Sequence, residues 1–297
     1  MTDKRSKEQL LDRISQLEQE VKEREQDIVR FRSELVDANQ RLETLIGQIA
    51  GQLRTVESLQ RMLIPTEFPN ISGLEFSSKF VPSLVSGGDY FDIFEHEDPM
   101  HVGVVVASSS GYATSALLMS VLLKISGRME ARRQSAPHDI LNTIAEELVP
   151  GLSPQDKIDI FYSLLDRRTF ELHYCCLGKV GAVVQVFTGN ELKPAKLSGP
   201  AMDKSFKKLN SSHKLTLSSR DRLVICTRGV CEATNLSGES FGAERVLKSI
   251  AEGPRRGVHE IRNQILYEVQ KFSSLVEPRR DQTVIVVEVK DRVIKLA

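Results

Sequence analysis

The chain has 297 residues, of which 40% are hydrophobic and 27% are charged, so it can bury a sizeable core in one large domain or two smaller ones. Its 40 Lys and Arg residues balance 40 Asp and Glu residues, and a net charge of zero argues against binding to nucleic acid or an anionic membrane through bulk charge. No apolar run approaches the ~18 residues that a membrane-spanning helix needs, and the first residues are charged rather than an apolar signal segment. We therefore expect a cytoplasmic protein.

Residues 1–63 are predicted to form one long helix with a heptad repeat. Apolar residues recur at alternating spacings of four and three, as the a and d positions of a coiled coil do. The apolar residues of this seam are Leu10, Ile14, Leu17, Val21, Ile28, Phe31, Leu35, Ala38, Leu42, Leu45, Ile49, Val56, Leu59 and Leu63. Such a helix cannot bury its own stripe, so we expect a homodimeric coiled coil through residues 10–63. Arg24 and Gln52 interrupt the seam and could fix its register at a cost in stability. The alternative is an amphipathic helix that lies on its own domain.

Residues 64–297 are predicted to be one globular domain, because Pro65 and Pro69 end the helix. The predicted strands are Glu75–Val81, Val102–Val106, Asp159–Asp166, Glu171–Cys176, Ala182–Phe187, Leu215–Leu217, Leu223–Thr227 and Thr283–Val289. The predicted helices are Ser115–Glu130, Pro137–Leu148 and Val258–Phe272. Strands in runs, with two helices together and one late, favour an α+β fold in which mostly antiparallel sheets form a sandwich flanked by helices.

The four cysteines fit a reducing compartment. Cys175 and Cys176 are adjacent on a predicted strand, so their thiols point to opposite faces and cannot hold one ion together. Cys226 and Cys231 lie far from them in sequence, and no CxxC or His-x-His pattern is present. We expect four reduced thiols that pack as small hydrophobic groups, and no zinc site.

Five short segments carry the functional signal of the globular part. In chain order they read QRMLIP at 60–65, SGGDYFD at 86–92, ASSSG at 107–111, TRGVCEA at 227–233 and RDQT at 280–283. In this order and spacing they resemble the SpoIIE-type branch of the PPM metal-dependent serine/threonine phosphatases, over about residues 60 to 290. The resemblance implies a PPM phosphatase-like β-sandwich. It also implies a site where two Mn²⁺ or Mg²⁺ ions activate a water that attacks phosphoserine.

Three metal-ligand positions of that family are changed in this chain. The candidate site residues that the resemblance points to are Gly88, Asp89, Asp92, Ser108, Arg228, Glu232, Arg280 and Asp281. Aspartates are expected at positions that here read Ser108, Arg228 and Arg280, and the phosphate-side signature Ala-Gly-His-x-Pro reads LGKVG at 177–181. The three replacements shift the local charge by about five units, where one charge pair at ~4 Å is worth about 4 kcal/mol at an effective dielectric constant near 20. Guanidinium stays protonated at physiological pH. We expect no metal cofactor and no catalysis, with Asp89 as the residual candidate ligand.

The replacements also predict how the pocket stays stable. We expect Arg228, Arg280 or both to pair with Asp89, because a guanidinium binds a carboxylate through two hydrogen bonds. A second possibility is an anion site that binds a phosphorylated peptide or a nucleotide without cleaving it. Plain structural roles are the remaining alternatives: a turn and helix cap at 108–111, a solvated pair at Arg279 and Arg280, and turn hydrogen bonds at Asp89 and Asp92.

These observations predict a signalling protein of bacterial type, with a dimerising and signal-transmitting helix at 1–63 and a pseudophosphatase domain at 64–297. The resemblance implies a protein partner in a phospho-signalling pathway, such as the anti-sigma-factor antagonists that active members dephosphorylate. One alternative is a divergent metal-dependent phosphoserine/threonine phosphatase that uses Asp89, Asp92, Glu232 and Asp281. The other is a coiled-coil scaffold that the globular domain merely caps.

Overall fold

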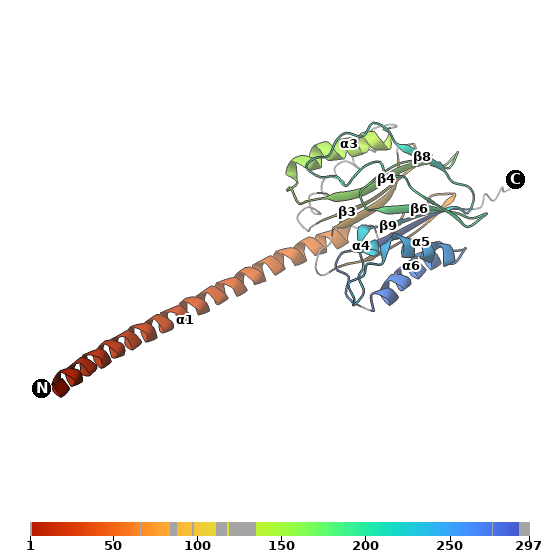
Figure 1. Cartoon of the computed structure of the whole chain (residues 1–297). Helices are drawn as coiled ribbons and strands as arrows, with labels where there is room; N and C mark the ends of the chain where they lie inside the picture. The colour runs from red at the N-terminus through yellow and green to blue at the C-terminus, as the bar shows by residue number, and fades with distance from the viewer. Residues whose placement is uncertain are drawn as a thin grey trace, which may run out of the picture. The chain divides into compact units, whose positions relative to one another are not determined.

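The computed structural model describes residues 2–63, 65, 67–83, 88–96, 98–110, 118, 135–274 and 276–290. The chain divides into two compact units, residues 1–57 and 58–297. The predicted long helix is confirmed, because α1 runs without a break over Thr2–Leu63 (Figure 1). No helix in the described ranges is both long and apolar enough to cross a membrane.

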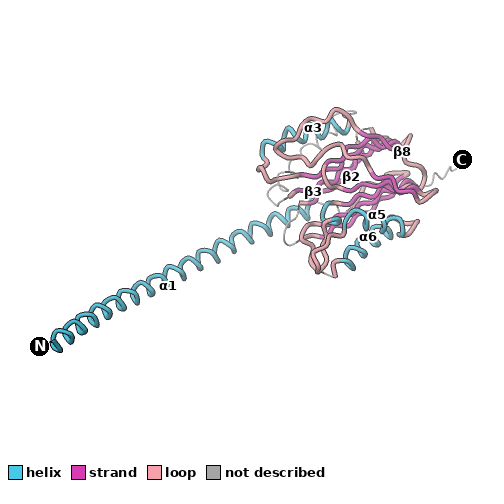
Figure 2. Tube along the Cα trace, viewed as in Figure 1, coloured by secondary structure: helices cyan, strands magenta, loops and turns pink. Residues whose placement is uncertain are grey.

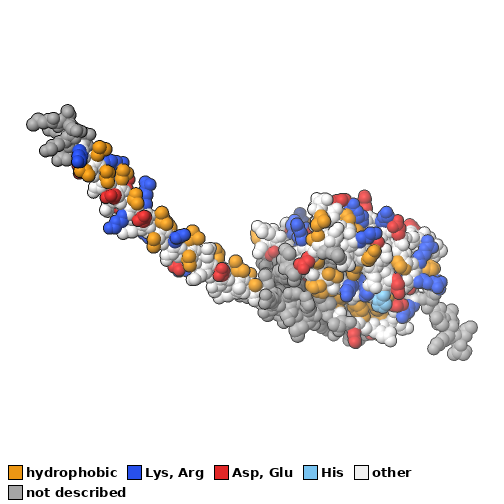
Figure 3. All heavy atoms as spheres, turned by 90° about the horizontal axis from the view of Figure 1, so that it is seen from below, with side chains coloured by type: hydrophobic (Ala, Val, Ile, Leu, Met, Phe, Trp, Pro, Cys, Tyr) orange, Lys and Arg blue, Asp and Glu red, His pale blue; other side chains and the backbone are white. Residues whose placement is uncertain are grey.

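The large apolar seam residues of α1 between Leu10 and Ile49 are exposed to solvent. Their exposed fractions run from 43% at Leu17 to 64% at Phe31. Figure 3 shows hydrophobic side chains exposed along this helix among charged ones. A helix of this kind gains most of its stability from packing its apolar face, and in this chain the seam residues between Leu10 and Ile49 pack against no other described element.

Within the described residues, ten strands form two antiparallel five-stranded sheets (Figure 2). The first sheet has the order β1 (Leu74–Val81), β10 (Gln282–Val289), β9 (Arg222–Cys226), β6 (Gly181–Val186) and β7 (Glu191–Pro194). The second has the order β2 (Asp89–Glu95), β3 (His101–Ser109), β4 (Ile158–Asp166), β5 (Glu171–Leu177) and β8 (His213–Thr216).

Helices cover the outer faces of the two sheets. On the second sheet lies α3 (Pro137–Leu148), followed by the short 3-10 helix η1 (Val149–Gly151). On the first sheet lie α5 (Gly242–Glu252) and α6 (Val258–Phe272), while the one-turn α4 (Arg228–Cys231) follows β9 (Figure 1). The predicted α+β sandwich flanked by helices is therefore confirmed.

Alternation along the strands divides the core into three apolar layers. Val104 packs between the two sheets, whereas its neighbour Val105 packs under α3. Ile225 and Val224 divide in the same way between the inner layer and the layer under α5 and α6. Strands buried on both faces explain why β3, β9 and β10 read as continuous apolar runs.

The thiols follow the same alternation. Cys176 lies in the layer between the sheets and Cys175 in the layer under α3, which confirms that they point to opposite faces. All four cysteines are free thiols. Burial raises the pKa of Cys176 to about 12, so this thiol packs as an inert hydrophobic group.

All eight predicted strands are present, with ends shifted by a few residues, and the predicted helices at Pro137–Leu148 and Val258–Phe272 match α3 and α6. The sequence interpretation missed β2, β7, α4 and α5. Of the predicted helix at Ser115–Glu130 only Leu118 is described; it is helical and buried, and the rest lies outside the described residues.

Candidate functional site

A row of polar side chains crosses the second sheet at one end. Asp89 on β2 pairs with Ser108 on β3, and Ser108 pairs with Asp159 on β4. Each points into the space between the sheets, because Asp89 lies two residues from Phe91 and Asp159 two residues from Phe161, both in the inner core layer. The inner layer therefore changes from apolar to polar at this end of the sandwich.

Asp89 is buried and held by hydroxyl groups. Its Oδ2 accepts hydrogen bonds from the Oγ1 atoms of Thr227 at 2.6 Å and Thr283 at 2.8 Å, at the adjoining ends of β9 and β10. Burial, together with the nearby Asp281 carboxylate, raises the pKa of Asp89 to about 7, although the Ser108, Thr227 and Thr283 hydroxyls oppose the shift. Sequence reasoning quoted both threonines within motifs but assigned them no role.

Asp281, just before β10, fixes the backbone of the segment that leads into β2. Its Oδ1 accepts a hydrogen bond from the amide of Ser83 at 2.8 Å, and its Oδ2 accepts from the amides of Gly88 at 2.8 Å and Asp89 at 3.3 Å. Only 3% of the surface of Asp281 is exposed. Gly88 thus contributes to the site through its backbone.

Arg228 reaches the polar row from the start of α4. Its Nη1 lies 3.7 Å from Asp159 Oδ2, and its Nε donates to Glu232 Oε1 at 2.8 Å. Burial raises the pKa of Asp159, while the backbone amide of Lys179 and the Arg228 guanidinium act in the opposite direction. The guanidinium thus bridges two carboxylates, Asp159 and Glu232, at the edge of the polar row.

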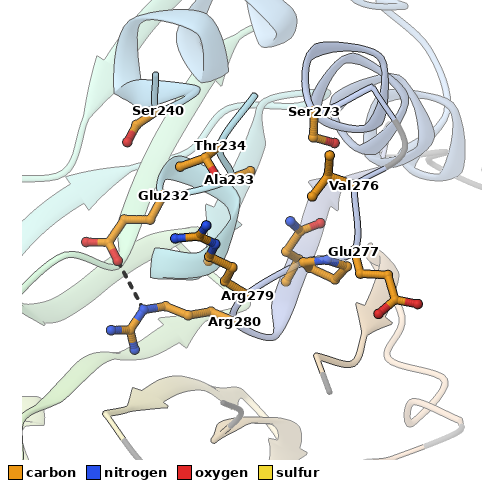
Figure 4. A pocket seen from close by; sticks show the side chains of 12 residues that line it. Glu232, Ala233, Thr234, Ser240, Ser273, Val276, Glu277, Arg279 and Arg280 are labelled. Carbon is orange, nitrogen blue, oxygen red and sulfur yellow. Dashed lines mark ion pairs between the residues drawn. The ribbon is translucent and has the colours of Figure 1, made fainter. Parts of the chain in front are cut away.

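Glu232 collects three cationic side chains. Besides Arg228, Lys179 Nζ contacts its Oε1 at 2.9 Å. Arg280 Nε contacts its Oε2 at 3.1 Å (Figure 4). Burial alone would raise the pKa of Glu232, but the Lys179 and Arg228 hydrogen bonds outweigh it and lower the pKa. The altered 177–181 segment therefore belongs to the site through Lys179.

Two glycines allow these elements to approach closely. A Cβ at Gly229 would lie 2.0 Å from the carbonyl oxygen of Asp281, so α4 can pack against the start of β10 only without a side chain there. A Cβ at Gly178 would lie 1.9 Å from Asp159 Oδ1, and its φ of +71° also favours glycine.

Three expectations about this site need correction. The pairing of Arg228 or Arg280 with Asp89 is wrong, because both guanidinium groups bind Glu232 while threonine hydroxyls engage Asp89. Ser108 belongs to strand β3 rather than to a turn, and Gly111 lies outside the described residues. Arg280 is not a solvated residue, since its side chain is 31% exposed and paired.

Asp92 lies apart from the other candidates. On β2 it alternates with Asp89 and Phe91, so it shares the outer face of the sheet with Tyr90. Its Oδ1 accepts a hydrogen bond from the amide of Ile93 at 2.8 Å, within strand β2 and not in the turn that the structural alternative predicted. Asp159, and not Asp92, belongs to the polar row with Asp89 and Ser108. The sequence analysis missed Asp159 because its only link to the site is that β4 pairs it with Ser108 on β3, and strand register cannot be seen in the sequence.

The donor set does not fit a pair of divalent cations. Hard cations need several anionic oxygens free to coordinate, whereas Asp89 and Asp281 accept hydrogen bonds from hydroxyl and amide groups, and Asp159 faces a guanidinium. In the part of the chain that the structure describes, no three acidic, imidazole or thiol side chains are grouped so as to hold a metal ion.

A cavity of about 300 Å³ adjoins Glu232 (Figure 4). Its lining is mostly polar and combines α4, the end of α6 and the segment before β10. The lining residues are Gly229, Glu232, Ala233, Thr234, Ser240, Ser273, Val276, Glu277, Pro278, Arg279, Arg280 and Gln282.

This double sandwich with a polar site at one end is the fold of the PP2C and SpoIIE phosphatase domains. Residues 98–290 match the family model of stage II sporulation protein E (SpoIIE). The match covers more than half of the chain, so this protein belongs to the SpoIIE family. No match was found among curated protein sequences.

Solved structures share the fold at low sequence identity. The SiaA-PP2C domain of Pseudomonas aeruginosa aligns with a TM-score of 0.68 and 17% identity, covering 82% of this chain and 97% of that one. The PP2C phosphatase domain of SpoIIE from Bacillus subtilis, with a fragment of its regulatory domain, gives 0.60 and 15%, covering 73% and 63%. The RsbU and RsbW domains of a Mycobacterium tuberculosis protein give 0.60 and 14%, covering 76% and 63%.

Proposed function

We propose that this chain is a catalytically inactive SpoIIE-family protein, a pseudophosphatase. The observation that carries the proposal is the position of the Arg228 guanidinium, 3.7 Å from Asp159 and 2.8 Å from Glu232. A permanent cation between these carboxylates neutralises the charge that would attract Mn²⁺ or Mg²⁺ and repels either ion directly. Ser108 supplies a neutral oxygen where the family has a charged one, which weakens the site further.

The test is metal binding and turnover on one sample of the full chain. We expect no heat of binding when Mn²⁺ or Mg²⁺ is titrated in a calorimeter, and no hydrolysis of a phosphoserine peptide. The matched variant combines Ser108→Asp, Arg228→Asp and Arg280→Asp, with folding checked by circular dichroism. It is expected to bind Mn²⁺, because it restores three carboxylates to the pocket.

A divergent phosphatase is the second candidate. It draws support from Asp89, Asp159 and Asp281, carboxyl groups that remain at this end of the sandwich, two of them close enough for Asp281 to raise the pKa of Asp89. Turnover by the unmodified chain that requires Mn²⁺ and is abolished by Asp89→Asn would establish this candidate and overturn the first.

We infer that the inactive domain acts by binding a protein of a phospho-signalling pathway, of the anti-sigma-factor antagonist type. The cavity beside Glu232 supports this inference, because it presents arginine, glutamate and hydroxyl groups to a partner. Calorimetric titration with such an antagonist, with and without serine phosphorylation, tests it. Ser240→Trp would fill the cavity and is expected to weaken binding at least tenfold. Ser237→Trp, on the same loop but outside the lining, is the control. Equal binding by both variants would show that the partner does not bind in this cavity.

The same proposal includes a homodimer through residues 10–63. The exposed seam of α1 supports it, since burying such a stripe is what stabilises a long isolated helix. Sedimentation equilibrium of the full chain should give twice the chain mass. A monomer at micromolar concentration would contradict it without bearing on the pocket.

A further inference from the structure

The outer face of the first sheet carries a buried polar cluster at the end remote from Asp89. Gln185 on β6, Arg222 on β9 and Glu288 on β10 pair in register across three neighbouring strands. Arg222 begins β9, and Thr227, whose hydroxyl binds Asp89, follows the last residue of that strand. At ~3.3 Å per residue the two positions lie about 16 Å apart along the strand. The cluster is therefore separate from the candidate site.

Arg222 has one nitrogen without a hydrogen-bond partner among the residues that the structure describes. Only 2% of its surface is exposed. Its Nε pairs with Glu288 and its Nη1 donates to the carbonyl oxygen of Pro254 at 2.7 Å, whereas its Nη2 has no acceptor in the described part of the chain. The guanidinium stays protonated, and a buried charged donor that is left unpaired costs stability. Nη2 is thus a donor that an oxygen of a ligand can satisfy.

The neighbouring Gln185 leaves an acceptor in the same condition. Its Nε2 donates to Asn190 Oδ1 at 2.9 Å and to the carbonyl oxygen of Ile250 at 3.1 Å, and these acceptors fix the orientation of the amide. The residue is 4% exposed, and its Oε1 has no partner among the described residues. An oxygen that satisfies both Arg222 Nη2 and Gln185 Oε1 must accept one hydrogen bond and donate another, as a hydroxyl group does.

A cavity of about 10 Å³ lies beside these two side chains. The residues that line it are Gln185, Phe187, Asn190, Arg220, Arg222 and Arg255. Its volume is about what one oxygen of the size of a water molecule needs, so one atom of a ligand can enter it. Arg255 is exposed, and the Arg220 guanidinium lies 5.0 Å from the centre of the Phe187 ring. Because three of the lining residues are arginines and none of the described ones is acidic, the cavity favours an anion.

We propose that this cavity is a binding site for a small oxyanion that carries a hydroxyl group, with inorganic phosphate as the representative ligand. The hydroxyl oxygen accepts a hydrogen bond from Arg222 Nη2 and donates one to Gln185 Oε1. The anionic oxygens stay outside the cavity, where the exposed Arg255 can reach them. A water molecule would satisfy the same two atoms but would bring no negative charge to a lining that contains three arginines. The site does not depend on whether the domain is a phosphatase.

Calorimetric titration of the full chain with inorganic phosphate at pH 7.5 tests the proposal. We expect saturable binding with a Kd of about 1 mM or tighter. Sulfate has a similar size and charge but no hydroxyl group, so it cannot donate to Gln185 Oε1 and should bind at least tenfold more weakly. O-phosphoserine, whose second pKa is about 6, is mostly without a hydroxyl hydrogen at this pH and should behave like sulfate. This comparison separates free phosphate from a phosphorylated protein as the ligand.

A pair of neighbouring arginines provides the matched variants. Arg255→Gln removes a guanidinium from the lining at an exposed position, so the fold should be kept, as circular dichroism can check. It should weaken phosphate binding at least tenfold, because a charge-assisted hydrogen bond is lost. Arg256→Gln makes the same change in net charge at the next residue, which is exposed and outside the lining, and should leave the affinity within twofold.

Three results would overturn the proposal. A titration without saturable phosphate binding would mean that the cavity holds water only. Equal affinities for phosphate and sulfate would remove the hydroxyl contact with Gln185. Equal effects of Arg255→Gln and Arg256→Gln would show that phosphate binds elsewhere on the chain. None of these results bears on Mn²⁺ binding or phosphatase turnover, so failure here and failure of the pseudophosphatase proposal are distinguishable.

Discussion

Asp159 is a buried carboxyl whose ionised form needs a cation close by. In an active two-metal pocket such charge would be balanced by divalent ions, and in this chain a guanidinium stands beside it. The distance of 3.7 Å and the 20% exposure of the Arg228 side chain make this a looser contact than a fully buried pair. The contribution of Arg228 to stability is accordingly below the ~3–5 kcal/mol seen when a fully buried pair is broken.

Removing Arg228 should destabilise the globular unit. We expect Arg228→Ala to lower the free energy of unfolding by about 1–3 kcal/mol, because Asp159 and Glu232 both lose a partner. Urea denaturation followed by circular dichroism measures the change. The control is Lys248→Ala, which breaks an exposed pair with Glu252 on α5 and should cost no more than about 0.5 kcal/mol. Equal effects of the two variants would show that Arg228 stabilises nothing in the pocket.

Asp89 predicts a pH dependence of stability. Its pKa rises from 3.8 in a solvated chain to about 7 in the fold, so the native state holds this proton more tightly than the unfolded chain does. The stabilising contribution is complete below about pH 4 and is lost as the pH rises through 7, by at most about 4 kcal/mol. Asp89→Asn should flatten that part of the stability curve in urea titrations between pH 4 and 8. Asp139→Asn, at an exposed carboxyl of α3, should leave the slope in place; an unchanged slope in Asp89→Asn would refute the assignment.

Strands and helices with a clear apolar pattern could be predicted from the sequence. The candidate site could be predicted only in part. β3, β9 and β10 are apolar on both faces, and α6 has a regular apolar stripe, so each gives a strong local signal. β2 begins with Asp89 and carries Asp92, so its pattern read as a motif rather than a strand. α4 is one turn long and gives no periodic signal.

The pairings within the site depend on contacts between distant segments. Arg228 and Glu232 are four residues apart, which favours a contact only once α4 is known to be helical. Asp159 joins Ser108 through strand register, and Lys179, in the turn between β5 and β6, joins Glu232 after α4. Spacing in the sequence predicts neither of these two contacts. The loss of three aspartates was visible in the sequence, but the partners that replace the metal ions were not.

The junction of β9 and β10 gives a prediction at this scale. Thr283→Val keeps the side-chain shape on β10 but removes one of the hydroxyl donors to Asp89 Oδ2. We expect a loss of about 1–2 kcal/mol in the free energy of unfolding at pH 8, where Asp89 is ionised, and a smaller loss at pH 5. Thr216→Val, the same change at an exposed position of edge strand β8, should be nearly neutral. A loss that does not depend on pH would point to packing rather than to the hydrogen bond.

At the scale of the whole molecule, two units with different sources of stability share one chain. The globular unit is stabilised by three buried apolar layers and by the ion pairs of its pocket, all within one copy. The proposed coiled coil is stabilised only when two copies meet, so its melting follows mass action. The melting of the coiled coil should therefore depend on protein concentration, and the melting of the globular unit should not.

We expect two thermal transitions in the full chain, one of which depends on protein concentration. Raising the concentration a hundredfold should raise the midpoint of the helical transition, followed at 222 nm, and leave the globular transition unmoved. Arg24→Leu should raise only the first midpoint, because a leucine at d packs better than a guanidinium. Arg228→Ala should lower only the second, because sites that share no partners act independently. A single transition that shifts in both variants, or a helical midpoint independent of concentration, would mean that α1 is stabilised within one chain and that the seam serves another contact.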